Sequence, residues 1–165
     1  MGVTGITETR QYLTFKLADE VFAVDVAKVR EILDFTSITR VPKMPEFMRG
    51  VINLRGSVVP VVDMRLKFGM EQTEKTVNTC IIVLEVLMEG EATVVGALAD
   101  SVQEVFELEP EQIEPAPRIG TKLNTDFITG MGKHGEQFII ILDVEKVFCA
   151  SDIGMVDDLS EAVNG

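Results

Sequence analysis

The chain offers few side chains that could act as a catalytic acid, base or nucleophile. Its 165 residues include one histidine, His134, and two cysteines, Cys80 and Cys149. His134 lies in a predicted hairpin tip, where side chains are normally solvated. Paired with a nearby carboxylate it could serve as a general base, so a minor enzyme or a small-ligand-binding β-barrel is an alternative function. The cysteines lie in apolar runs and are expected to be buried, which fits a cytosolic protein.

The sequence contains none of the common motifs for metal binding, nucleotide binding or nucleophilic catalysis. It has no Cys-x-x-Cys pair, no glycine-rich phosphate loop and no Gly-x-Ser-x-Gly elbow. Asp63 and Asp143 follow similar apolar runs, where a carboxylate is expected to cap a helical turn. We therefore expect no catalytic residue, no metal and no cofactor.

Two oppositely charged residues are better candidates for a functional surface. Glu31 belongs to a segment with helical spacing of apolar residues, and Arg55 lies at the tip of a predicted hairpin. Arginine suits a fixed ion pair with a carboxylate. We predict that Glu31 and Arg55 pair and shape a protein-binding groove, with two separate solvated charges as the alternative.

The elements that position this pair occur twice. Residues 47–68 are similar to residues 127–148, and residues 29–32 are similar to residues 102–105. The second copy has His134 in place of the tip arginine, so that arginine belongs to one copy only. Internal repetition of this kind predicts two similar lobes packed into one body.

Short apolar stretches between glycine turns predict a mostly β fold of two small antiparallel barrels with a few short helices. Asp25 is expected to cap a short helix that extends to Leu33. Residues 100–106 could form either a helix or a strand. Strands are expected at residues 12–17, 21–24, 51–54, 58–62, 80–86, 92–98, 127–130 and 138–142.

The predicted domain covers residues 10–150. We divide it into a first lobe at about residues 10–74 and a second at about residues 75–150. An acidic C-terminal tail is expected at residues 151–165. Each lobe alone is near the lower size limit for a stable core, so the two lobes should pack on each other.

Charge is unevenly distributed along the chain. The net charge is −12, which argues against a nucleic-acid-binding protein. Residues 40–67 contain six basic and two acidic residues, whereas residues 85–114 contain nine acidic and no basic ones. This separation could steer a charged protein partner, or it could reflect solvated faces without a partner.

No targeting or membrane segment is expected. Residues 1–9 lack the basic start and apolar stretch of a signal peptide. The apolar runs are far shorter than the ~20 residues that a membrane span needs. The sequence therefore predicts a cytoplasmic protein without direct membrane insertion.

The run Asn53-Leu54-Arg55-Gly56 resembles the CheW family of chemotaxis coupling proteins, together with Gly50-Val51 before it and residues 58–65 after it. The resemblance covers roughly residues 11–150, which is most of the chain. It also includes the segments Val29-Arg30-Glu31-Ile32, Pro42, Phe47, Ile113-Glu114-Pro115-Ala116-Pro117 and Ile128-Thr129-Gly130-Met131-Gly132.

This resemblance implies two packed five-stranded, SH3-like antiparallel β-barrels without enzymatic activity. It implies an adaptor that couples methyl-accepting chemoreceptors to the histidine kinase CheA. Its partners would be the cytoplasmic tips of the receptors and the regulatory domain of CheA, which has the same fold. The protein would then be cytoplasmic and recruited to membrane receptor arrays.

The resemblance also implies which residues contact partners or hold the groove. The chain is too short for the whole kinase, and only about fifteen residues follow the domain, too few for the phosphoacceptor domain of a CheV-like hybrid. The residues at matching positions are Val29, Glu31, Gly50, Asn53, Leu54, Arg55 and Gly56.

Overall fold

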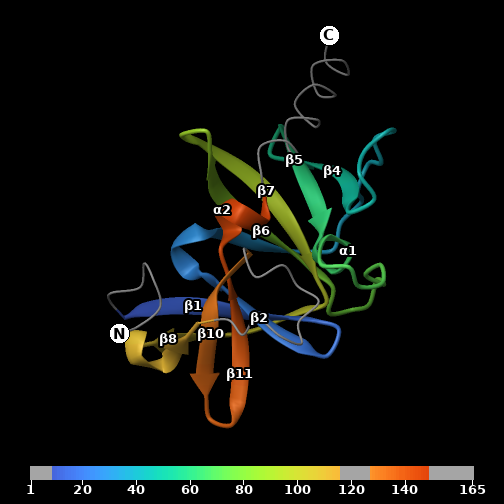
Figure 1. Ribbon diagram of the computed structural model, residues 1–165. Helices are drawn as coiled ribbons and strands as arrows, with labels where there is room; N and C mark the ends of the chain where they lie inside the picture. The colour runs from blue at the N-terminus through green and yellow to red at the C-terminus, as the bar shows by residue number, and fades with distance from the viewer. Residues whose placement is uncertain (1–8, 116–126, 149–165) are drawn as a thin grey trace.

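A computed structural model describes residues 9–115 and 127–148, which form two curved β-sheets packed against each other (Figure 1). The first sheet has the order β8-β1-β2-β11-β10-β9 and the second has the order β3-β6-β7-β5-β4. The strands of the first sheet are β1 (Arg10–Leu17), β2 (Glu20–Asp25), β8 (Ser101–Leu108), β9 (Ile113–Glu114), β10 (Ile128–His134) and β11 (Gln137–Leu142). Those of the second are β3 (Val29–Asp34), β4 (Met48–Leu54), β5 (Ser57–Asp63), β6 (Cys80–Met88) and β7 (Glu91–Ala99).

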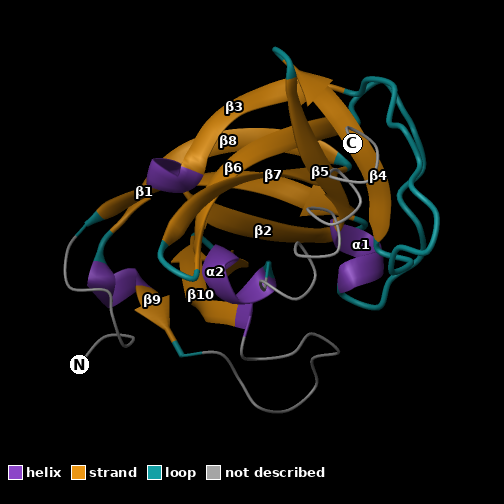
Figure 2. Cartoon of the chain, turned by 90° about the horizontal axis from the view of Figure 1, so that it is seen from above, coloured by secondary structure: helices purple, strands orange, loops and turns teal. Residues whose placement is uncertain are grey.

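The mostly β prediction is confirmed, with two adjustments. The first sheet has a sixth strand, the two-residue β9. Each sheet also contains one parallel pair, β2 with β11 and β5 with β7, whereas wholly antiparallel barrels were expected. Two α-helical turns, α1 (Met64–Lys67) and α2 (Val144–Val147), follow β5 and β11 and are shown in purple in Figure 2.

The two sheets share one strand order, because β8-β1-β2-β11-β10 corresponds position by position to β3-β6-β7-β5-β4. The sequence duplication is therefore a duplication of topology. The lobe boundary at residue 74, however, does not separate the sheets. The hairpin β1–β2 joins strands from the second half of the chain, and the hairpin β6–β7 joins strands from the first half. In each sheet, therefore, the first hairpin comes from one copy of the repeat and the other three long strands come from the other copy.

Three apolar clusters follow from this arrangement. The largest lies between the sheets and includes Phe15, Phe22, Phe68, Ile82 and Phe148. A smaller cluster fills each barrel, because alternate residues of a strand point to opposite faces. The shared cluster joins the lobes into one packed body.

The segment after Asp25 differs from its prediction. Asp25 does act as an N-cap, and its Oδ1 accepts a hydrogen bond from the Ala27 amide at 2.9 Å. The capped element is only a three-residue 3-10 turn, Val26–Lys28, and the chain then continues as strand β3. β3 pairs with β6, so sheet pairing overrides the helical spacing. Residues 100–106 likewise belong mainly to a strand, β8.

Some predicted features lie outside the described residues. These are Cys149, residues 116–117 of the proline-rich loop and the acidic tail at 151–165. Cys80 is buried as expected, and burial raises the pKa of its thiol to about 11. None of the helices in residues 9–115 and 127–148 is long and apolar enough to cross a bilayer.

Candidate functional site

The predicted ion pair between Glu31 and Arg55 is confirmed. The Arg55 guanidinium donates two hydrogen bonds, from Nη1 to Glu31 Oε2 at 2.8 Å and from Nη2 to Glu31 Oε1 at 2.9 Å. This fork-to-fork geometry fixes both the distance and the relative orientation of the two side chains.

A two-residue turn presents Arg55. Leu54 pairs with Ser57, so Arg55 and Gly56 form the turn between β4 and β5, with φ of 50° and 87°. Two successive positive φ angles are typical of a type I′ hairpin turn, whose twist matches that of its strands. The Asn53 side chain supports the turn, because its Oδ1 accepts a hydrogen bond from the Gly56 amide at 2.8 Å.

Glu31 reaches Arg55 from a strand, where a helix was expected. β3 and β4 lie at opposite ends of the five-stranded sheet order. The curvature of the sheet brings these ends together, and the pair spans the seam between them. An isolated bridge between Thr39 and Val51 joins the same two parts of the chain. The ion pair therefore helps to close the barrel as well as to shape its surface.

The pair is accessible to a partner. The exposed fraction is 71% for the Arg55 side chain and 28% for that of Glu31. Hydrogen bonding by Arg55 lowers the pKa of Glu31, and hydrogen bonding by Glu31 raises the pKa of Arg55. The pair thus stays ionised at neutral pH, and its contribution is lost only as the pH falls through the lowered pKa of Glu31.

The other matched residues divide into tip residues and buried residues. Asn53 and Gly56 are exposed beside Arg55 at the hairpin tip. Val29 is half-buried against the shared core, Leu54 is half-buried against the core of its own barrel, and Gly50 is buried. The geometry of this second group indicates that it holds the framework under the exposed pair.

Two exposed apolar residues were missed by the sequence analysis. Ile32 on β3 is 44% exposed and Val58 on β5 is 46% exposed. Interpreting residues 29–34 as a strand would have placed Arg30 and Ile32 on the outward face. A helix over the same residues would instead place Ile32 on its buried face, so its exposure was not predicted.

The correspondence predicted for His134 is also corrected. His134 pairs with Gln137, just as Leu54 pairs with Ser57, so His134 takes the position of Leu54 and not that of Arg55. Its ring is exposed and stacks on Phe106, with centroids 4.3 Å apart. This stack joins β10 to β8, and no hydrogen bond or ion pair joins His134 to a carboxylate within the described parts of the chain.

Within residues 9–115 and 127–148, no group of three or more His, Cys, Asp or Glu side chains could hold a metal ion. What the site offers is a fixed charge pair, an edge strand and exposed apolar side chains, a combination suited to contact with another protein.

Comparisons with known proteins agree on one family. The sequence model of the CheW-like domain family matches residues 11–151. The chain is 37% identical to the chemotaxis protein CheW of Klebsiella aerogenes, over 97% of this chain and 94% of that protein. It is 34% identical to a probable chemotaxis protein CheW of Rhizobium etli, over 87% of this chain and 90% of that protein.

A solved structure gives the same result. The crystal structure of the scaffolding protein TtCheW from Thermoanaerobacter tengcongensis superposes with a TM-score of 0.76 at 34% identity. The match covers 84% of this chain and 92% of that one.

Proposed function

The chain belongs to the CheW family, and from this premise we propose how it couples its partners. Members of this family are chemotaxis adaptors, and this protein couples chemoreceptors to the histidine kinase CheA. We propose that it does so by binding the regulatory domain of CheA and the cytoplasmic tips of methyl-accepting receptors. The protein would then be cytoplasmic and recruited by these contacts to membrane receptor arrays.

The observation that carries the proposal is the bidentate pair between Glu31 and Arg55 on an exposed seam. The pair pre-orients the guanidinium, so less side-chain entropy is lost when a partner binds it. Arginine offers five donors, and Glu31 occupies two of the nitrogens, which leaves other N–H groups for a carboxylate or carbonyl of the partner.

Apolar contact on the outer face of the same sheet would add to the affinity. Ile32 and Val58 are exposed on strands of the same sheet, and β3 is an edge of that sheet. An edge strand can pair with a strand of another chain, and its outward side chains then set specificity. We therefore assign partner contact to Glu31, Asn53, Arg55 and Gly56, and framework support to Val29, Gly50 and Leu54.

The test replaces Arg55 by alanine and measures binding to a receptor cytoplasmic fragment and to CheA, together with receptor-coupled kinase activity. We expect at least about a tenfold loss of affinity for one partner, which is the size typical of an interfacial arginine. Lys133→Ala is the control, because Lys133 is an exposed cation on β10, which belongs to the other sheet.

A charge swap separates the two roles of the pair. In the double variant Glu31→Arg with Arg55→Glu, an ion pair across the seam can re-form, but the charge shown to the partner is reversed. We expect this variant to fold like the wild type and to bind poorly. Full binding by Arg55→Ala with an unchanged melting temperature would refute the assignment of this surface.

A further inference from the structure

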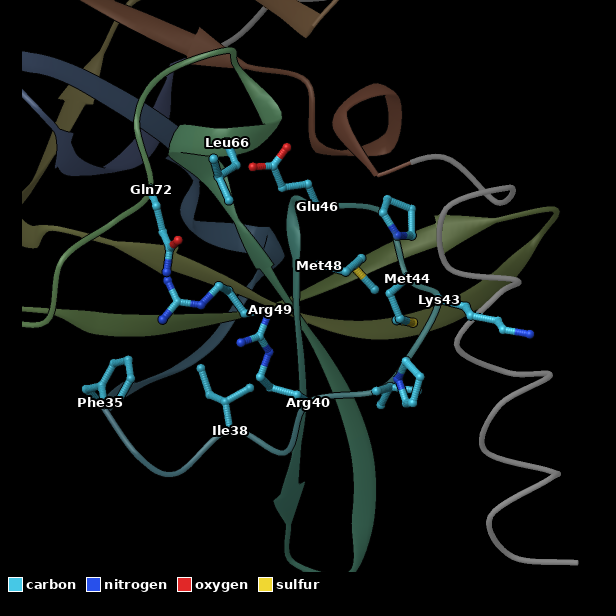
Figure 3. Close-up of a pocket in the computed structure, with 13 residues that line it drawn as sticks. Phe35, Ile38, Arg40, Lys43, Met44, Glu46, Met48, Arg49, Leu66 and Gln72 are labelled. Atoms are coloured by element: carbon cyan, nitrogen blue, oxygen red, sulfur yellow. The ribbon is translucent and has the colours of Figure 1, made fainter.

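A hollow of about 680 Å³ lies beside the second sheet, between the long loop after β3 and the segment after α1 (Figure 3). Residues 35–49 line most of it, and Leu66 and Gln72 complete the wall. The proposed partner surface at Glu31 and Arg55 does not contribute to this lining, so the hollow is a second feature of the molecule.

The lining combines apolar and basic side chains. Phe35, Ile38, Met44, Met48 and Leu66 supply the apolar part, in which the flexible methionines can adapt to an occupant. The charged lining residues are Arg40, Lys43, Arg49 and Glu46.

Two of the cations at the hollow have no ion-pair partner among residues 9–115 and 127–148. Arg49 donates to Asp63 Oδ2 and to the Thr73 carbonyl, both at 3.2 Å, so its charge is already matched. Arg40 and Lys43 have no ion-pair partner in the described parts of the chain, and Glu46 is the only lining carboxylate. Figure 3 shows the Arg40 side chain directed into the hollow and Lys43 directed outward from its rim.

We propose that the C-terminal segment of the same chain, residues 149–165, docks in this hollow. The segment contains Asp152, Asp157, Asp158 and Glu161 and has no lysine, arginine or histidine. Interspersed among these carboxylates are five sizeable apolar residues, namely Ile153, Met155, Val156, Leu159 and Val163. Its composition thus complements both the cations and the apolar wall.

The attachment point makes the segment a favoured occupant. Phe148, the last described residue, is buried in the shared core together with Met48, and Met44 packs against the same core. Seventeen extended residues can span about 55 Å, whereas a domain of this size is about 40 Å across. The segment can therefore reach the hollow from Phe148.

Covalent attachment also compensates for weak contacts. A tethered segment experiences an effective concentration in the millimolar range. Exposed charge pairs contribute little individually and are screened by salt. An acidic segment of a separate protein would have to compete with this internal one, so docking would screen the basic hollow from weak acidic partners. This inference goes beyond the proposed coupling function and does not rest on it.

The experiment uses the full chain and a spin label near its end. The label is attached through Asn164→Cys in a Cys149→Ser background, where the buried Cys80 should stay unlabelled. We expect the label to broaden the amide NMR signals of residues 40–49 selectively. Raising the salt concentration from about 50 to about 500 mM should reduce the broadening.

Variants identify the contacts. Arg40→Glu with Lys43→Glu should lower the ratio of docked to free segment by about tenfold. Lys133→Glu makes the same type of charge change at the tip of β10–β11, away from the hollow, and should leave the broadening unchanged. Neutralising the segment with Asp157→Asn and Asp158→Asn should also weaken its docking and so reduce the broadening at residues 40–49.

Three results would overturn the proposal. The first is an absence of selective broadening at residues 40–49. The second is broadening that survives both the reversal at the hollow and the neutralisation of the segment. The third is broadening that appears only when labelled and isotope-enriched chains are mixed, which would make a second copy the occupant.

Discussion

At the scale of single residues, Gly50 shows how a sequence match can reflect backbone geometry. Its φ is +141°, a conformation that side chains with a Cβ rarely adopt. A Cβ at this position would lie 2.1 Å from the Thr39 carbonyl oxygen. This close approach belongs to the Thr39–Val51 bridge that helps to close the barrel.

Gly50→Ala should therefore destabilise the protein by about 3 kcal/mol or more, since it combines backbone strain with a main-chain clash. Urea unfolding followed by circular dichroism would measure the loss. Gly56→Ala is the matched control, because a Cβ there meets nothing within 4 Å, and only its φ of 87° causes strain. A cost near 1 kcal/mol is expected for it. Equal stabilities of the two variants would contradict this account.

The residue-scale prediction from sequence succeeded for the charges and failed for their apolar neighbour. Glu31 and Arg55 could be matched because a planar guanidinium suits a fixed ion pair with a carboxylate. Ile32 was missed, because on a strand its side chain points away from Glu31, whereas a helix would have given it an inward face.

At the scale of elements, α1 depends on one buried carboxylate. Asp63 is fully buried and accepts hydrogen bonds from the Thr73 hydroxyl at 2.7 Å and the Thr73 amide at 3.0 Å. It also accepts from the amides of Arg65 and Leu66, and so caps the helix as predicted. A buried charge is tolerated only when it is satisfied in this way.

Its counterpart Asp143 occupies the N-cap of α2 but makes no side-chain cap hydrogen bond. Asp63→Ala should cost about 3–5 kcal/mol, because it leaves Arg49 and the Thr73 donors without their acceptor. Asp143→Ala should cost about 1 kcal/mol or less. Thermal and chemical unfolding of the two variants side by side would test this difference. A larger loss of stability for Asp143→Ala than for Asp63→Ala would contradict this prediction.

The element-scale error has a physical origin. The inward positions of β3 are Val29, Glu31 and Leu33, so a charged residue interrupts the apolar alternation that signals a strand. The same stretch has apolar residues three positions apart, as a helix does. Pairing with β6 decided between the two, and that pairing is formed by residues about fifty positions away.

At the scale of the whole molecule, the duplication was visible in the sequence but the exchange of hairpins was not. Spacing along the chain identifies two copies, yet it does not say which copy's strands pair. Burial favours the exchange, because β1–β2 and β6–β7 each present one face to the shared core. Polar contacts also support the exchanged arrangement. Arg65 forms an ion pair with Asp100, and Asp100 also accepts a hydrogen bond from the Ala18 amide at the β1–β2 turn.

The exchange predicts a single cooperative unfolding transition, because neither half of the chain contains all the strands of one sheet. Calorimetry should give equal calorimetric and van't Hoff enthalpies, as for a two-state domain. Fragments 1–74 and 75–165, expressed separately, should lack stable structure, since each has lost the hairpin that completes its sheet. Mixed together, they should regain the native circular dichroism spectrum. Two resolved transitions, or an independently folded 1–74 fragment, would show that the lobes are separable.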